Sequence, residues 1–186
     1  MIPLELEIKN FLSHRESFLD FSKFQSALII GNIDGNYEFS NGSGKSALLA
    51  SILWCLFNKS RVANADDVVL WGENLCKVAF TFRHFDKIYK VVRKRNRTNS
   101  TTSVEFLQFI DNEWNNISGS TSSLTNTEIE KTIKFDYKTF ISSVYFGQND
   151  ISEFADSDPA KKKTILKSII DLSKWDQYEE KAKERL

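Results

Sequence analysis

Residues 42–46, Gly-Ser-Gly-Lys-Ser, have the types and order of a segment that binds phosphate groups. The glycines let backbone N–H groups converge on an anion at the start of a helix, where the helix dipole adds to the attraction. The lysine that follows, Lys45, reaches the β- and γ-phosphates of a nucleotide, and the hydroxyl of Ser46 takes one coordination position of Mg²⁺. The segment therefore predicts a nucleotide site with Gly42 and Gly44 beside the phosphates. The alternative is a Gly-Ser turn that precedes Lys-Ser by coincidence.

The first glycine of the phosphate-binding pattern is displaced. The pattern G-x-x-x-x-G-K-[ST] sets a glycine five residues before Gly44, where this chain has Phe39. Gly31 lies 13 residues before Gly44 (44 − 31), so an insertion of eight within 32–40 makes Gly31 the first glycine. A smaller insertion after Gly35 is the alternative, but Gly35 does not end the preceding strand. The inserted segment carries acidic residues that would repel phosphates, so we expect it to loop outward.

Hydrophobic periodicity predicts the elements that must position this loop. A continuous apolar run over 26–31 predicts a strand buried on both faces directly before the loop. Apolar residues on every side from 45 to about 58 predict a buried helix directly after it. Alternation predicts five further strands, the last three as an antiparallel meander, over 4–11, 16–21, 77–85, 87–95 and 102–110.

The chain changes character after residue 157. A helix is predicted over 125–133, where Thr125 and Glu128 have capping-box spacing. From 158 to 186, apolar residues recur at steps of three or four with Lys and Glu between them, which predicts the start of a coiled coil. We expect a lobe over 1–157 and a coil root over 158–186. Because no helix-stop signal closes the coil, we expect the chain to be a fragment.

The composition favours a soluble globular protein of the cytoplasm, with no membrane contact. Hydrophobic residues make up 41% of the chain and charged residues 27%. Early charges exclude a signal peptide, and the longest apolar run, 47–57, is too short to span a bilayer. The two cysteines have no metal-like spacing. Lys+Arg and Asp+Glu are equal at 25 each, so any surface for an anionic partner must be local.

One local basic stretch stands out, residues 87–97. It predicts contacts to the phosphate backbone of DNA, without base readout. The alternative is a solvated hairpin edge whose charges prevent edge pairing. The candidate DNA-binding residues are Lys90, Arg93, Lys94, Arg95 and Arg97.

Three stretches together resemble one family: IKNFLSH at 8–14, LIIG at 28–31 followed by NGSGKSALLASILWCLF at 41–57, and VYFGQNDISEF at 144–154 before the coil. They resemble the ATPase subunit of the SbcC-type DNA double-strand-break repair nuclease complex, in the SMC-like branch of ABC-type ATPases. The resemblance implies an α/β fold, the N-terminal lobe of an ABC-type P-loop ATPase head. That lobe has a mixed sheet with an antiparallel meander and a Walker A helix, and the start of an antiparallel coiled coil follows it.

The resemblance also implies roles for individual residues. Gln148 corresponds to the glutamine that contacts magnesium and the attacking water, and Lys45 acts with it in catalysis. Leu12 stands where relatives often carry a phosphate-holding arginine, and Arg15 is the alternative for that contact. The implied cofactors are ATP and Mg²⁺, with metal contacts from Ser46 and Gln148. The implied nucleotide contacts are Ser13, His14, Gly31, Asn41, Gly42, Ser43, Gly44, Lys45, Ser46 and Ala47.

The implied partners are the C-terminal half of the same head, a second head in a homodimer, double-stranded DNA, and an SbcD-type nuclease subunit at the coil base. The half that supplies the catalytic glutamate and the signature motif does not occur in this chain. A rival is an SMC- or RecF-like head, or a non-hydrolysing scaffold, that has no nuclease partner. A GTPase is disfavoured because the sequence NKSR at 58–61 lacks the aspartate that reads guanine.

Overall fold

The computed structural model describes residues 1–32, 42–145, 158–160, 162–163 and 183. The chain divides into two compact units, residues 1–134 and 135–186. The expected boundary after residue 157 adjoins residues outside the described ranges and stays a prediction, as does the coil over 158–186. Asn41, Gln148 and most of the predicted loop insertion also lie outside them.

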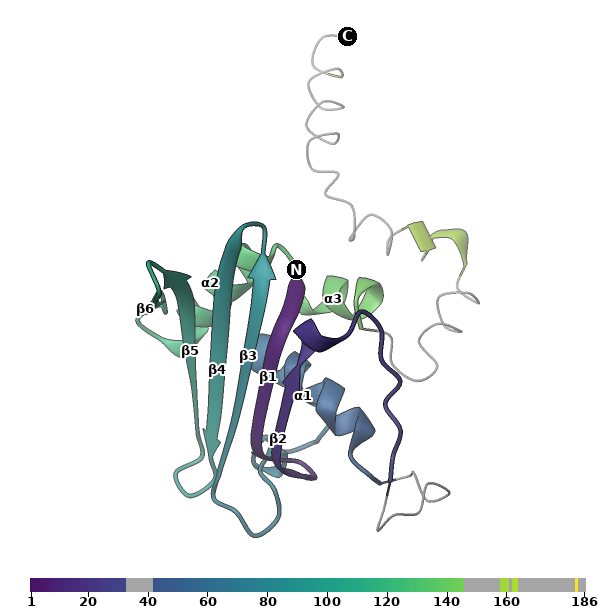
Figure 1. Ribbon diagram of the computed structural model, residues 1–186, viewed down its shortest axis with the longest axis vertical. Helices are drawn as coiled ribbons and strands as arrows, with labels where there is room; N and C mark the ends of the chain where they lie inside the picture. The colour runs from purple at the N-terminus through teal and green to yellow at the C-terminus, as the bar shows by residue number, and fades with distance from the viewer. Residues whose placement is uncertain (33–41, 146–157, 161, 164–182, 184–186) are drawn as a thin grey trace. The chain divides into compact units, whose positions relative to one another are not determined.

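A six-stranded sheet forms the frame of the first unit, in the order β2-β1-β3-β4-β5-β6 (Figure 1). Every neighbouring pair of these strands is antiparallel. The first five strands confirm the alternation in the sequence, and β3, β4 and β5 are the predicted meander. The strands are β1 (Ile2–Phe11), β2 (His14–Asp20), β3 (Leu75–His84), β4 (Lys87–Asn96), β5 (Thr101–Ile110) and β6 (Glu113–Asn116).

Two helices cover one face of this sheet, α1 (Lys45–Phe57) and α2 (Ser122–Ile133) (Figure 1). The core lies between them and the strands, where Phe11, Phe80 and Phe106 are almost completely buried. Two short 3₁₀ helices, η1 (Phe21–Lys23) and η2 (Ala65–Val68), border the same unit. Among the described residues no helix covers the opposite face, which we call the open face.

The strand predicted over 26–31 is not part of the sheet. Residues 27–32 belong to no helix or strand. Leu28 and Ile30 are 84% and 61% exposed, although the run reads as a doubly buried strand. A strand is held by hydrogen bonds to neighbours, and the described residues of this chain supply none here. The prediction was therefore wrong for the chain by itself.

The start of α2 also differs from the predicted capping box. The helix begins at Ser122, and the Thr121 hydroxyl accepts a hydrogen bond from the backbone N–H of Leu124. Thr125 is instead buried inside the first turns, where its hydroxyl donates to the carbonyl of Thr121 at 2.9 Å. In the second unit, α3 (Tyr137–Ser143) begins after Asp136, whose carboxylate accepts from the N–H of Thr139.

Candidate functional site

The phosphate-binding segment lies at the start of α1. Gly42 and Gly44 have φ of +84° and +88°, in the left-handed region that glycine adopts without strain. Helix α1 begins at Lys45, and no described side chain caps it at Gly44. The Lys45 ammonium donates to the Ser43 hydroxyl at 3.4 Å, and Ser46 is exposed on the first turn. These residues present a helix N-terminus whose dipole favours an anion.

Gly44 is required by its surroundings as well as by its backbone angle. A Cβ atom at this position would lie 2.9 Å from both the Ser13 hydroxyl oxygen and His14 Nε2. Contacts this short do not occur at real Cβ atoms, so a larger residue would require the Ser13 and His14 side chains to shift. The structure thus brings Ser13 and His14, predicted near the nucleotide, against the phosphate-binding segment, 30 residues away in sequence.

His14 connects the two segments by hydrogen bonds. Its Nε2 lies 3.0 Å from the carbonyl oxygen of Gly44, and its Nδ1 lies 2.8 Å from the Ser17 hydroxyl. A carbonyl oxygen only accepts, so Nε2 carries a proton and donates it. The Gly44 carbonyl also accepts from the N–H of Leu48, the first hydrogen bond of α1. His14 therefore orients the peptide group from which the helix starts.

The turn that carries Ser13 and His14 is held from its other side by the last residue of η2 and the residues after it. The N–H of Leu12 donates to the carbonyl of Val68 at 2.7 Å, and the N–H of Leu70 donates to the carbonyl of Asn10 at 2.8 Å. Asn10 and Leu12 both have positive φ, near +50°, which a tight turn between strands requires. Arg15 lies 3.8 Å from the Glu73 carboxylate and is exposed.

Gly31 is buried and belongs to no strand, and Ala47 is half-buried in the first turn of α1. The two cysteines are unsuited to nucleophilic chemistry. Burial raises the pKa of the Cys55 thiol to about 12 and of the Cys76 thiol to about 11, so both stay protonated near neutral pH. The described ranges contain no cluster of three His, Cys, Asp or Glu side chains that could hold a metal ion.

The predicted DNA-binding residues do not form one surface. Arg93 is completely buried on the covered face, where its guanidinium donates to the carbonyl of Cys55 at 2.9 Å and to Asn126 Oδ1 at 2.8 Å. It also donates to the carbonyl of Leu56 at 3.4 Å, so it binds the C-terminal end of α1, where the helix dipole favours a cation. Desolvation lowers the pKa of Arg93 to about 10. The expectation that Arg93 contacts DNA is contradicted by this burial.

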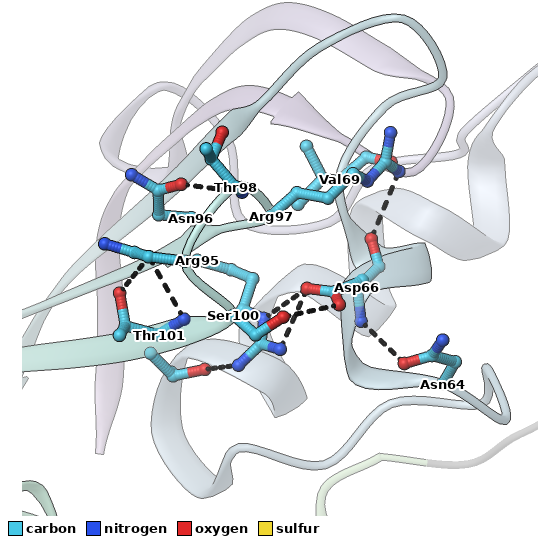
Figure 2. A network of polar contacts seen from close by, with 11 residues as sticks. Asn64, Asp66, Val69, Arg95, Asn96, Arg97, Thr98, Ser100 and Thr101 are labelled. Atoms are coloured by element: carbon cyan, nitrogen blue, oxygen red, sulfur yellow. Dashed lines mark hydrogen bonds and ion pairs between the residues drawn. The ribbon is translucent and has the colours of Figure 1, made fainter.

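Arg95 and Arg97 are also turned inward, as Figure 2 shows. The Arg95 guanidinium donates to one carboxylate oxygen of Asp66 through two nitrogens, each at 2.8 Å. Arg97 donates to the carbonyl oxygens of Asp66, Val69 and Glu73 at 2.8 to 3.2 Å. Both side chains are committed to contacts within the protein. Sequence reasoning missed Asp66, because its partners lie about 30 residues away along the chain.

Lys90 and Lys94 lie on the open face. Lys94 pairs with Glu105 at 2.9 Å, and the Lys90 ammonium lies 4.9 Å from the centre of the Trp114 ring. The strand register places Lys94 opposite Lys77, and Lys77 opposite Lys9, so three lysines stand side by side across β4, β3 and β1. Like charges directly opposite one another are destabilising. Lys9 and Lys77 were not among the predicted residues, although the alternation of β1 and β3 places them on this face.

The chain matches the profile of a family described as an AAA domain over residues 5–186. It is 26% identical to a DNA double-strand break repair Rad50 ATPase of Thermoplasma volcanium, over 94% of this chain and 18% of that protein. It is 28% identical to the protein of the same description from Thermoplasma acidophilum, over 95% of this chain and 18% of that one. The chain thus spans less than a fifth of these relatives.

Among solved structures, the SMC head domain from Thermotoga maritima is similar over 62% of this chain and 39% of its own, at 19% identity and a TM-score of 0.39. A likeness this distant carries no argument. No described helix is long and apolar enough to cross a membrane. The relatives confirm the resemblance to repair ATPases, and the family match with the observed meander and Walker A helix confirms the expected fold class. With 182 of its residues, 5–186, inside the matched profile, the chain belongs to the AAA domain family.

Proposed function

We propose that this chain is the ATP-binding, N-terminal half of a DNA-repair ATPase head, which hydrolyses ATP once the rest of the head completes it. The observation that carries the proposal is the packing of Ser13 and His14 against Gly44 at the start of α1. A Gly-Ser turn that preceded Lys-Ser by coincidence would have no reason to be held by a distant turn. The similarity to repair ATPases over nearly the whole chain supports the same function.

The residues of the segment fit Mg²⁺ and ATP. The two positive-φ glycines open the backbone toward an anion, and the exposed Ser46 offers a hydroxyl of the kind that Mg²⁺ accepts. Lys45 supplies a positive charge beside the phosphates and Ala47 a first-turn N–H group. When bound, Mg²⁺ would offset phosphate charge during hydrolysis. Asn41, Gly31 and Gln148 keep their proposed roles, with Asn41 and Gln148 outside the described residues.

The exposed apolar stretch over 27–30 supports a partner that completes the head. Leu28, Ile29 and Ile30 are exposed directly before Gly31. Burial of such apolar side chains is the dominant favourable contribution to most protein–protein association. We propose that the C-terminal half of the head covers this stretch. A second head would then supply the groups that a single head lacks, as the resemblance implies.

The open face is the proposed DNA surface, in a form revised from the sequence prediction. It retains Lys90 and Lys94, adds Lys9 and Lys77, and leaves out the arginines that are bound inside the protein. Three aligned lysines cost stability unless an anionic partner or nearby carboxylates offset the repulsion. Glu7 and Glu105 offset part of it, at 3.6 and 2.9 Å from Lys77 and Lys94. These exposed pairs are weak enough for DNA phosphates to replace them.

A nuclease subunit remains the proposed partner at the root of the coil. The proposed location is the cytoplasm, in association with the nucleoid for a cellular protein and in the host cytoplasm for a viral one. An SMC-like head without a nuclease is the second candidate. The two candidates differ in DNA cleavage. In an SMC-like head, ATP binding would alter the association with DNA and no DNA cleavage would accompany it. A non-hydrolysing scaffold would bind ATP and release no phosphate.

The test is ATP binding, measured by calorimetry, to the complex of this chain with the co-purified C-terminal half. We call this complex the completed head. We expect saturable binding of Mg-ATPγS that Lys45→Ala abolishes. The matched control is Lys59→Ala, because Lys59 is an exposed lysine just beyond the other end of α1. Equal binding by the Lys45→Ala and control heads would refute the nucleotide site. Phosphate release by the wild-type head would then separate the ATPase from the scaffold.

A further inference from the structure

A short segment, residues 64–74, connects the end of β4 with the turn that carries Ser13 and His14. We call it the connecting segment. It contains η2, whose first turn is capped by the Asn64 side chain accepting from the N–H of Asp66. Val68 and Val69 are almost completely buried, so the segment is fixed against the core. It contains none of the residues that the resemblance assigns to the nucleotide.

Asp66 is the centre of the contacts at one side of the connecting segment (Figure 2). One carboxylate oxygen accepts from two nitrogens of Arg95, and the other accepts from the Ser100 hydroxyl at 3.1 Å. Arg95 also donates to the Thr102 hydroxyl at 2.9 Å. The side chains of Arg95 and Asp66 are only 11% and 22% exposed, so solvent screens this pair much less than a surface pair.

Arg97 fixes the same segment through its backbone. Its guanidinium donates to three carbonyl oxygens there, and its own N–H donates to the carbonyl of Asn74 at 2.8 Å. Arginine can hold several acceptors at once because its donors lie in one rigid plane. The end of β4 and the start of β5 therefore hold the connecting segment from Asp66 to Asn74.

The other side of the segment holds the turn between β1 and β2. Val69 forms an antiparallel bridge with Phe11, flanked by the hydrogen bonds of Leu12 to Val68 and of Leu70 to Asn10. This turn places His14 Nε2 at 3.0 Å from the Gly44 carbonyl. The contacts from Asp66 to Gly44 are thus hydrogen bonds or covalent neighbours, by way of Val68, Leu12 and His14.

We propose that Asp66 is a positioning residue for the nucleotide site, acting through the connecting segment and His14 on the first peptide group of α1. The inference rests on the proposed function of residues 42–47. Asp66 itself touches no nucleotide. It fixes where the turn between β1 and β2 lies, and that turn fixes the Gly44 carbonyl from which the phosphate-binding helix begins.

The effect on affinity follows from what the displaced turn would lose. Because the bound head needs the turn in place, nucleotide binding to the variant must restore it. The largest cost is that of the His14–Gly44 hydrogen bond, about 0.5–1.5 kcal/mol, or about two- to tenfold in the dissociation constant. We expect Asp66→Asn to raise the Kd of the completed head for Mg-ATPγS by about that factor. In the His14→Ala head the hydrogen bond to Gly44 is already absent, so Asp66→Asn should change the Kd by less than about twofold.

The experiment is a double-mutant cycle by calorimetry on the completed head, with Asp66→Asn and His14→Ala alone and together. Arg97→Lys replaces Asp66→Asn in a second cycle, because it keeps the charge and loses the planar set of donors. The second cycle tests the proposal if Asp66→Asn does not fold. The matched control is Asp20→Asn. Asp20 is another aspartate at a 3₁₀ helix: it caps η1 by accepting from the N–H of Ser22, at the far end of β2 from His14.

Weaker ATP binding by Asp66→Asn or Arg97→Lys that disappears in the His14→Ala background, with an unchanged Asp20→Asn head, supports the proposal. A purely structural role for Asp66 would lower the unfolding temperature and leave the Kd of the folded head unchanged, which overturns it. So would equal fold-changes in both backgrounds. A wild-type head that binds no ATP would instead refute the proposed function, and the inference with it.

Discussion

Replacement of Arg93 by methionine removes a guanidinium that donates to the carbonyl oxygens of Cys55 and Leu56 and to Asn126 Oδ1. Two of these bonds are short, at 2.9 and 2.8 Å, and the side chain is completely buried. Hydrogen bonds to charged groups contribute about 1.5–3 kcal/mol each, and methionine regains part of the loss by apolar burial. We expect the free energy of unfolding to fall by about 2–4 kcal/mol.

The neighbouring Lys94 is the matched control, because it lies on the same strand and points to the open face. Its ion pair with Glu105 is 38% and 45% exposed, so Lys94→Met should change the free energy of unfolding by about 1 kcal/mol or less. The DNA affinities should show the opposite order. Lys94→Met should reduce the slope of log K against log salt by about one, and Arg93→Met should leave it unchanged.

Urea unfolding of the completed head, followed by tryptophan fluorescence, measures the first difference, and Trp54 in the core reports it. Salt titrations of duplex DNA binding measure the second. Equal stability losses in the two variants would refute the role of Arg93 as an anchor of α1. A reduced salt slope in Arg93→Met would show that this side chain reaches DNA and that its burial does not persist in the complex.

Two further predictions concern the glycine contact and the buried thiols. Gly44→Ala should destabilise the nucleotide-free head by about 1–3 kcal/mol more than Gly42→Ala, because both have positive φ but only the first Cβ meets Ser13 and His14 at 2.9 Å. Thermal unfolding measures this, and equal losses would mean that the turn yields at no cost. In the folded head the thiols of Cys55 and Cys76 have pKa values of about 12 and 11, raised from 9.0. Above pH 9 the folded thiols keep protons that the unfolded chain loses, so the free energy of unfolding falls as the pH rises. Between pH 9 and 10 the head with both cysteines replaced by alanine should lose about 2 kcal/mol less in urea unfolding than the wild type; parallel losses would contradict the raised pKa values.

The strands were predictable because their alternation reflects a sheet with one covered and one open face. In β3, Val78, Phe80 and Phe82 are buried on the covered face, and Lys77 lies on the other. The start of α1 was predictable because glycine, lysine and serine carry their roles in adjacent positions. These signals are local, so no knowledge of the rest of the fold was needed.

The same alternation indicates that the basic residues of β4 do not all lie on one face of the sheet. Arg93 shares its strand face with Tyr89 and Val91, two residues apart each time, so β4 directs it to the covered side. The prediction of one DNA-binding surface from the basic residues of 87–97 did not take this alternation into account. The edge strand β6 was also missed, although Asp111 and Asn112, both at positive φ, are typical of a two-residue hairpin turn.

Other features have no local signal. The apolar run over 26–31 has the composition of a buried strand, and composition cannot tell whether the burying partner lies within the same chain. The bonds from Asp66 to Arg95 and Ser100 join residues 29 and 34 apart, so spacing in the sequence does not indicate them. Such contacts depend on how the end of β4 folds back over η2.

The exposed stretch over 27–30 has a thermodynamic consequence for the assembly of the head. It leads directly into Gly31, so the proposed partner would, by covering it, also fix one side of the proposed nucleotide site. A ligand that binds only the assembled state stabilises that state by RT ln(1 + [L]/Kd), which is about 2.7 kcal/mol at a hundredfold excess over Kd. ATP at that level would tighten the association of the two halves about a hundredfold. The nucleotide concentration would then determine what fraction of the chain is assembled, before any hydrolysis takes place.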